Sequence, residues 1–398
     1  MPAVPRVTDA QRRARLVRRH HLDGSAADAV AAVAAVIAMH ASDPATPFLG
    51  VRARVAGVTR NAIAAPLYED RTLWRLHAVR RTLFVATVAD AVVLEAAAGR
   101  DVAARERRRL EGWLAAELGA DAVPGWLEEA ATQVLAVLAD GVPRATTGLT
   151  AAVPALATEV TLGSGRWVQR APVSSRLLFV LAMEGVIVRA APAGTWRSSQ
   201  YRWADTERWF GSRPARIEDP GDGRAALTGR YLATHGPATL TDLRWWSGWT
   251  ARQATAALTA VDARAVTLED GGEAWILPGD EVATDPDQGG VVTLLPALDP
   301  TPMGWKQRDW YLGAVDGVAA TQLYDRNGNV GPTVWLDGRV VGGWAVRGDG
   351  TVVHRLLEDV GADAAAAVER EAAALTTWLA GTPVTPRFRT PLERELTA

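Results

Sequence analysis

The fold is decided by residues 224–278, RAALTGRYLATHGPATLTDLRWWSGWTARQATAALTAVDARAVTLEDGGEAWILP. The stretch contains three runs typical of helices and two short apolar runs typical of strands, each bounded by a cap or a turn residue. In order, these are helix Arg224–His235 ending at Gly236-Pro237, helix 240–247 capped by Thr239, a turn at Gly248, helix 251–261 capped by Thr250, and strands 266–269 and 274–277 joined by Gly271-Gly272. Helix, helix, turn, helix and hairpin is the order of a winged-helix unit.

Two earlier regions show a similar order of helices followed by a hairpin. The first is predicted to contain helix 8–20 capped by Thr8 or Asp9, helix Ala26–Ala38 after Ser25, a helix from Pro44 to about Val55 capped by Ser42 or Asp43, helix 61–68, and a hairpin over 72–86. Helices over 88–140 extend this first region. The second region is predicted to contain helices over 147–160 and 173–184, followed by strands over 185–189 and 200–203. We therefore expect three tandem winged-helix units.

The chain becomes rich in strand-forming residues from Val291 onward. Asp337-Gly338 and Asp349-Gly350 are dipeptides typical of hairpin turns, and a final helix is predicted over 362–379. The predicted fold class is α+β. The expected divisions are 1–143 (unit 1 with a helical extension), 144–222 (unit 2), 223–289 (unit 3) and 290–398 (a β-rich portion with a terminal helix).

The charge of the chain is unevenly distributed. The formal net charge is −2, but residues 1–109 carry +8, 110–143 carry −6, 144–260 carry +6 and 261–398 carry −10. Nucleic-acid binding needs a local positive face and not a positive total, so this distribution is compatible with a DNA-binding protein. It is equally compatible with acidic helices that simply face solvent.

Several classes of protein are excluded or disfavoured. The chain has no cysteine, which excludes disulfides, cysteine zinc sites and cysteine nucleophiles. No Walker loop, Gly-x-Ser-x-Gly elbow or His-Glu-x-x-His motif is present. The longest apolar stretch, Ala26–Met39, is too short for a membrane span, and no secretory signal is apparent, so a cytoplasmic location is expected.

The clearest candidate for chemistry is His40, which is followed by Ser42 and Asp43. One interpretation is structural: His40 ends a helix, and Ser42 and Asp43 cap the next one. The other is functional: a water molecule is held between the imidazole and the hydroxyl, because a neutral imidazole can accept a proton. The 16 tryptophans also allow two roles, core packing for most and base stacking for any that are exposed.

Segments along nearly the whole chain resemble the AlkZ/YcaQ family of winged-helix DNA glycosylases. They are Met39-His-Ala-Ser-Asp-Pro-Ala-Thr46, Tyr68-Glu-Asp-Arg-Thr-Leu73, Val79-Arg-Arg-Thr-Leu-Phe84, Leu294-Leu-Pro-Ala-Leu-Asp-Pro300 and Gly342-Gly-Trp344. The resemblance implies three tandem winged-helix units and a C-terminal β-rich portion, arranged around a concave DNA-binding channel. It also implies a monofunctional glycosylase that hydrolyses the N-glycosidic bond of alkylated purines, including bulky N7-guanine adducts and some interstrand crosslinks, in repair or in self-resistance to a genotoxin. It implies no metal and no cofactor.

The family's catalytic element is Gln-x-Gln or Gln-x-Asp, and the matching positions here are His40-Ala41-Ser42. The resemblance therefore makes His40 and Ser42 the candidate catalytic pair, with Arg80 and Arg81 as candidate phosphate contacts. Arg52 and Arg54 follow the motif on the same predicted helix and could also bind DNA, although solvated surface arginines are an equal alternative.

Two other classes of function remain open at this point. One is a DNA-binding protein without catalytic activity, either a regulator or a lesion binder. The other is a protein-interaction module that uses winged helices as a scaffold. A regulator would usually bind as a dimer, and the sequence contains no heptad or other dimerisation element, so a monomer bound to double-stranded DNA is expected.

Overall fold

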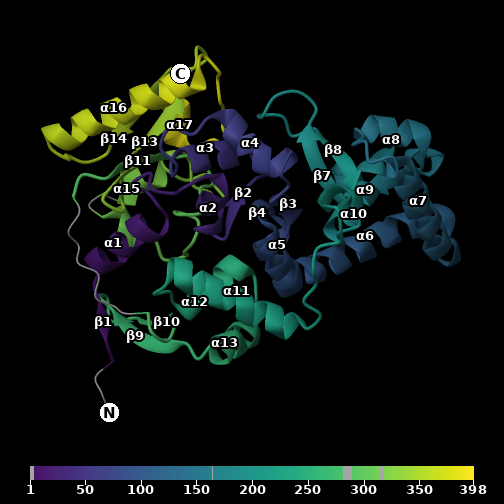
Figure 1. Cartoon of the computed structure of the whole chain (residues 1–398), viewed down its shortest axis with the longest axis horizontal. Coiled ribbons are helices and arrows are strands. Elements are labelled where there is room, and N and C mark those ends of the chain that lie inside the picture. The colour runs from purple at the N-terminus through teal and green to yellow at the C-terminus, as the bar shows by residue number, and fades with distance from the viewer. Residues whose placement is uncertain (1–3, 164, 281–288, 314, 316) are drawn as a thin grey trace.

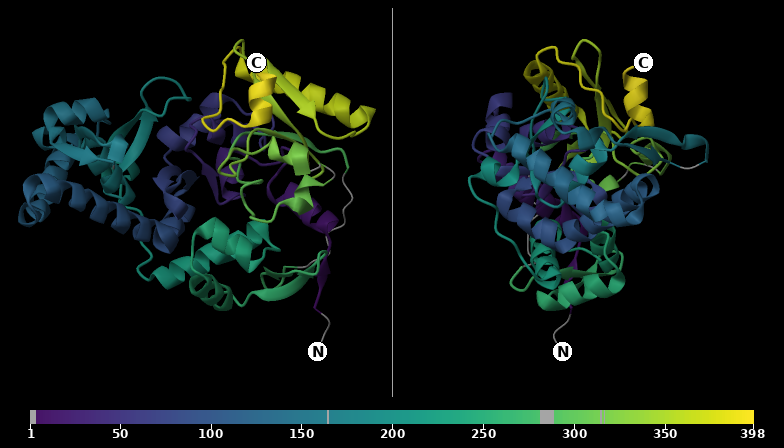
Figure 2. Two further views of the ribbon diagram at one scale, coloured as in Figure 1. Left: turned by 180° about the vertical axis from the view of Figure 1, so that it is seen from behind. Right: turned by 90° about the vertical axis from the view of Figure 1, so that its right-hand side faces the viewer.

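The computed structural model describes residues 4–163, 165–280, 289–313, 315 and 317–398. It contains helices and small, mainly antiparallel sheets, so the predicted α+β class is confirmed. In Figures 1 and 2 the first unit lies in the middle, the helical second unit extends to one side, and the third unit and the C-terminal portion lie on two further sides of it. The molecule is therefore assembled around the N-terminal unit.

The first unit is a three-stranded sheet with helices packed on it. Helix α1 (Asp9–Arg19) precedes it and is capped by Thr8, as predicted. The unit itself contains α2 (Ala29–Ala34), β2 (Ala38–His40), α3 (Thr46–Arg52), α4 (Arg60–Tyr68), β3 (Leu73–His77) and β4 (Leu83–Thr87). The strand order is β2-β4-β3, all antiparallel, and the predicted hairpin over 72–86 is confirmed.

The prediction of one long helix over Ala26–Ala38 was wrong. Helix α2 is capped by Asp28 and ends at Ala34, and residues 38–40 form strand β2 instead. Alanine favours a helix locally, but Ile37 has a left-handed backbone (φ 65°) and β2 pairs with β4. The hydrogen bonds to β4 therefore override the helix propensity of the alanines, and His40 belongs to a strand.

In the structure we define the second unit as residues 88–210, because residues between 110 and 203 form a hydrophobic core of their own. The predicted boundary at residue 143 therefore lies inside one core. The predicted helix 147–160 is also too long, because Glu159 begins a strand of an additional hairpin. The elements are α5 (Val88–Leu94), α6 (Arg100–Leu118), α7 (Val123–Leu138), α8 (Thr146–Ala152), β5 (Glu159–Leu162), β6 (Gln169–Pro172), α9 (Ser174–Met183), β7 (Ile187–Pro192), β8 (Tyr201–Asp205) and α10 (Thr206–Phe210). A π-helical segment, Glu95–Gly99, joins α5 to α6.

The third unit follows the predicted pattern closely. Thr239 and Thr250 each form a capping box, and Gly248 takes the left-handed conformation (φ 76°) that ends α12. The N-terminal strand β1 (Arg6–Val7) adds to its sheet in parallel with β9. The elements are α11 (Pro220–His235), α12 (Leu240–Ser247), α13 (Ala251–Ala260), β9 (Arg264–Leu268) and β10 (Glu273–Ile276).

The C-terminal portion is a four-stranded antiparallel sheet in the order β11-β12-β13-β14. Asp337 and Gly338 both have positive φ (50° and 77°), as a two-residue hairpin turn requires. The predicted helix over 362–379 is confirmed as α16. The elements are β11 (Val292–Leu295), α14 (Asp309–Leu312), α15 (Gly317–Thr321), β12 (Thr333–Leu336), β13 (Arg339–Val346), β14 (Val352–Leu356), α16 (Ala362–Leu379) and α17 (Pro391–Leu396).

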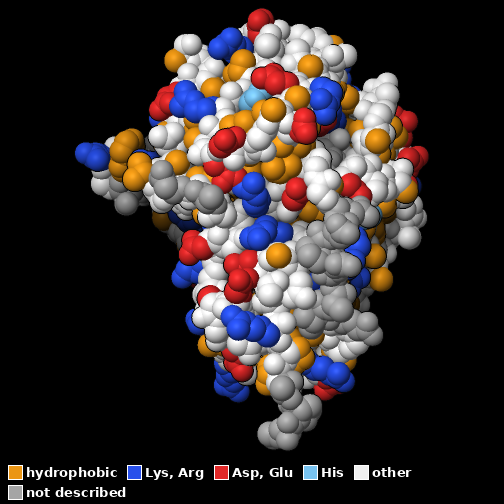
Figure 3. Space-filling model, turned by 90° about the vertical axis from the view of Figure 1, so that its left-hand side faces the viewer, with side chains coloured by type: hydrophobic (Ala, Val, Ile, Leu, Met, Phe, Trp, Pro, Cys, Tyr) orange, Lys and Arg blue, Asp and Glu red, His pale blue; other side chains and the backbone are white. Residues whose placement is uncertain are grey.

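A single large core joins the first unit, the third unit and the C-terminal sheet, whereas most of the second unit packs on itself. On the face seen in Figure 3, Lys and Arg side chains are interspersed with Asp and Glu. None of the helices described is long and apolar enough to span a membrane.

Candidate active site

His40 is the last residue of β2, at the centre of the first unit. Its backbone pairs with Phe84 of β4, and its ring packs on the Phe84 ring with the centroids 4.7 Å apart. The side chain is 5% exposed, and its ring nitrogens have no hydrogen-bond partner among the described residues. The imidazole is therefore held by packing and keeps its hydrogen-bonding capacity for a ligand.

His40 and Ser42 line the same pocket, which has a volume of about 300 Å³. Residues from all parts of the chain except the second unit contribute to its wall. Besides these two they are Arg80, Thr82, Trp245, Leu298, Met303, Asn327, Gly328, Asn329 and Phe388. The structure thus brings the two predicted catalytic residues together with one of the predicted phosphate contacts, Arg80.

The environment keeps His40 neutral. Burial, assisted by the positive charge of Arg80, lowers the pKa of His40 to about 3. At neutral pH the ring therefore has one N–H donor and one free nitrogen acceptor. Such a ring orients a water molecule well, but with this pKa it is a weak base.

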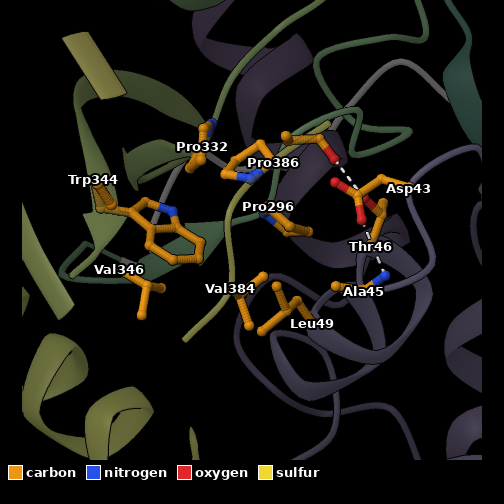
Figure 4. Close-up of a pocket in the computed structure, with 12 residues that line it drawn as sticks. Asp43, Ala45, Thr46, Leu49, Pro296, Pro332, Trp344, Val346, Val384 and Pro386 are labelled. Carbon is orange, nitrogen blue, oxygen red and sulfur yellow. Dashed lines mark hydrogen bonds between the residues drawn. The ribbon is translucent and has the colours of Figure 1, made fainter. Parts of the chain in front are cut away.

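The turn after His40 is held by the C-terminal segment. The Asp43 carboxylate accepts hydrogen bonds from the backbone amides of Ala45 (3.1 Å) and Arg387 (2.9 Å). Figure 4 shows the apolar pocket beside this turn, where Leu49 lies next to Val384 and Trp344 of β13 lies on the opposite wall. Asp43 therefore stabilises the turn and does not cap α3, which begins at Thr46 without a side-chain cap.

Arg54 is buried and not accessible to DNA, which argues against its predicted role as a DNA contact. Its side chain is completely buried and forms two hydrogen bonds with the equally buried Asp299 (2.7 and 2.9 Å). It also donates to Gly50 O and Thr301 Oγ1. A buried guanidinium needs such a partner, and this pair attaches the end of α3 to the loop after β11.

Arg52 lies apart from the pocket of His40. It forms an ion pair with Glu371 of α16 and lines a different pocket, between the first unit and that helix. Its carboxylate partner already neutralises its charge, so the structure does not support it as a phosphate contact.

Arg80 and Arg81 form the turn of the β3–β4 hairpin, as predicted, and both have positive φ (53° and 62°). Their environments differ. Arg81 is 46% exposed and forms an ion pair with Glu106 (3.0 Å). Arg80 has no carboxylate partner among the described residues, and it faces the pocket of His40.

Several pocket residues could not have been found from the sequence. Asn327, Asn329 and Phe388 are far from His40 along the chain, and they belong to no motif. Trp245 stood out only as one of three tryptophans at helical spacing. The structure distinguishes them: Trp246 and Trp249 are buried in the core, whereas Trp245 lines the pocket.

Two of the other histidines are buried away from this pocket. His20 and His235 lie in a buried aromatic cluster with Trp305. Among the residues that the structure describes, no group of three or more His, Asp or Glu side chains could hold a metal ion.

Comparison with known proteins identifies the family. No curated protein sequence matches the chain. Its structure is similar to that of the DNA glycosylase AlkZ from Streptomyces sahachiroi, with a TM-score of 0.69 and 22% sequence identity over 97% of this chain and 99% of the other. The sequence model of the family described as DNA glycosylase AlkZ-like matches residues 33–378. The chain therefore belongs to the AlkZ-like family of DNA glycosylases.

Proposed function

We propose that this protein is a monofunctional glycosylase that hydrolyses the N-glycosidic bond of alkylated purines in double-stranded DNA, with His40 and Ser42 as its catalytic residues. The observation that carries the proposal is the pocket in which both side chains lie beside Arg80 and Trp245. N7-alkylguanine, including bulky adducts and crosslinks, is the proposed substrate class.

The reaction needs little activation of the leaving group by the enzyme. Alkylation at N7 makes the purine cationic, so it leaves as a neutral base with the electron pair of the C1′–N9 bond. The sugar becomes an oxocarbenium ion, and water adds at C1′ and loses a proton. The enzyme must extrude the nucleotide, stabilise the cationic sugar and place the water.

His40 and Ser42 are suited to placing that water. The free nitrogen of His40 accepts one hydrogen bond from the water, and the Ser42 hydroxyl can donate to or accept from it. A protonated His40 would repel the cationic sugar, and burial prevents this by lowering the pKa of His40 to about 3. His40 therefore occupies the position of the first glutamine of the family's motif, and it acts as an acceptor that orients water.

The proposed reaction is hydrolysis and does not pass through a Schiff base. The only lysine of the chain, Lys306, is not among the pocket residues, so no amine is available there to attack C1′. The pocket wall as described also contains no carboxylate. The phosphates of the substrate would therefore supply the negative charge that stabilises the cationic sugar.

The deciding experiment uses a duplex with one N7-methylguanine and detects base release as strand cleavage after alkali. The wild type is expected to release the base, and His40→Ala is expected to be slower by about 10²- to 10⁴-fold. His40→Gln restores an acceptor without a titratable group and is expected to retain most of the activity. His354→Ala is the control, because His354 lies on β14 and is not among the pocket residues.

Each outcome has a clear meaning. No release by the wild type from methylated or bulky N7 adducts, with duplex binding intact, would favour the alternative of a lesion binder without catalytic activity. Full activity of His40→Ala would remove this residue from the mechanism. Loss in both His40→Ala and His40→Gln would show that His40 does more than accept a hydrogen bond.

A further inference from the structure

Two arginines from distant parts of the chain lie on the same indole ring. The guanidinium of Arg80 is 4.5 Å from the ring centroid of Trp245, and that of Arg308 is 5.4 Å from it. Arg80 comes from the β3–β4 turn, Trp245 from α12 and Arg308 from the segment before α14. We call these three residues the Arg80–Trp245–Arg308 cluster.

The cluster has two positive charges and no negative one. Within the described part of the chain, no carboxylate lies within 4.0 Å of either guanidinium. Partial burial and the charge of Arg308 lower the pKa of Arg80, which shows that the two cations oppose each other. Arg81, the next residue, has Glu106 as its partner. Of the two arginines in the β3–β4 turn, Arg80 is thus the one without a carboxylate partner among the described residues.

Both side chains are held in place in spite of this repulsion. Arg308 donates a hydrogen bond to Gly328 O (3.0 Å) and packs on the Tyr324 ring at 4.6 Å. Arg80 has a left-handed backbone, and a Cβ at Gly248 would lie only 3.1 Å from its Cγ. Fixed cations without a counterion form a preorganised site for an anion.

The position of the cluster indicates which anion. Arg80 and Trp245 line the pocket of His40 and Ser42, and Gly328, which holds Arg308, lines it too. A nucleotide whose C1′ reaches His40 must bring its own phosphates to the wall of this pocket.

We propose that Arg80 and Arg308, held on Trp245, bind one backbone phosphate next to the extruded nucleotide. The inference rests on the proposed function, because it requires the protein to bind duplex DNA. Arg308 is thus a second phosphate ligand that no motif indicated. It positions the nucleotide and takes no part in bond breaking.

The test measures binding of duplexes that carry a stable abasic analogue, with each phosphate near it replaced in turn by a neutral methylphosphonate. For the wild type we expect one position at which the replacement weakens binding about tenfold, as expected for loss of one charge-assisted contact. Arg308→Gln should weaken binding of the unmodified duplex by a similar factor. It should also make the slope of log K against log salt shallower by about 0.9. At that one position the methylphosphonate should then weaken binding less in this variant than in the wild type, because only Arg80 remains to contact the phosphate.

Two matched variants complete the design. Arg347→Gln makes the same charge change on the β13–β14 turn, at a residue that does not line the pocket, and should leave the salt slope unchanged. Arg308→Lys keeps the charge and should keep the slope, which separates a charge effect from damage to the loop. An unchanged salt slope in Arg308→Gln, or equal methylphosphonate effects in Arg308→Gln and the wild type at every position, would overturn the inference. Because no base release is measured, the site can be supported even if the glycosylase proposal fails.

Discussion

The buried pair Arg54–Asp299 offers a prediction about the stability of the scaffold around the site. Both side chains are fully buried, and Asp299 accepts two of the four hydrogen bonds that Arg54 donates. Asp299→Asn removes the negative charge and leaves the guanidinium buried without a counterion. The free energy of unfolding should therefore fall by about 3–5 kcal/mol, the usual cost of breaking a buried pair from one side.

The pair belongs to the part of the molecule that shares one core, and most of the second unit has its own. Unfolding by urea should thus be followed together with hydrogen exchange of separate segments. Exchange in α3 and β11 should become faster in Asp299→Asn, whereas exchange in α7 should not change.

Glu371→Gln is the control, because the Arg52–Glu371 pair is 13% and 27% exposed. Its loss should cost at most about 1 kcal/mol. If Asp299→Asn costs less than about 1 kcal/mol, or if α7 is destabilised as much as α3, the reasoning about this pair is refuted.

Three further predictions concern the site. Because burial lowers the pKa of His40 to about 3, enzymatic release of N7-methylguanine, corrected for the uncatalysed rate, should not decline near pH 6.5, the ordinary value for an imidazole; a decline there that is absent in His40→Gln would contradict this. The pKa of His235 is also lowered to about 3, so between pH 6.5 and 3 the folded protein binds fewer protons than the unfolded chain. Urea unfolding should therefore show the free energy of unfolding falling from pH 6.5 towards 3, by up to about 1.4 kcal/mol per pH unit for each of the two histidines. Gly248→Ala should weaken duplex binding by displacing Arg80, whereas Gly211→Ala, with a similar φ (79°) but open space around its Cβ, should change stability alone; equal duplex affinities would argue against this coupling.

Much of the fold was predictable because it depends on local interactions. The capping residues Thr239 and Thr250, the left-handed Gly248 and the Asp337-Gly338 turn act within a few residues of themselves. The helices and strands between residues 220 and 276 therefore agree with those predicted from the sequence. The spacing of His40 and Ser42 made them candidates, whereas their proposed catalytic role rests on the family resemblance.

Other features depended on contacts between distant residues. The alanines before His40 favour a helix, and only pairing with β4 makes residues 38–40 a strand. The sequence around Arg54 is compatible with a surface arginine. Only the folded structure shows that its side chain is buried and that Asp299, 245 residues away, neutralises its charge.

The sequence by itself thus determined the α+β class and the order of helices and strands in residues 224–278. The tertiary structure decided which side chains face the pocket, that His40 stays neutral, and that Arg80 meets Arg308 on Trp245. The physical reason is that caps and turns act over a few residues, whereas burial and charge depend on neighbours that only folding brings together.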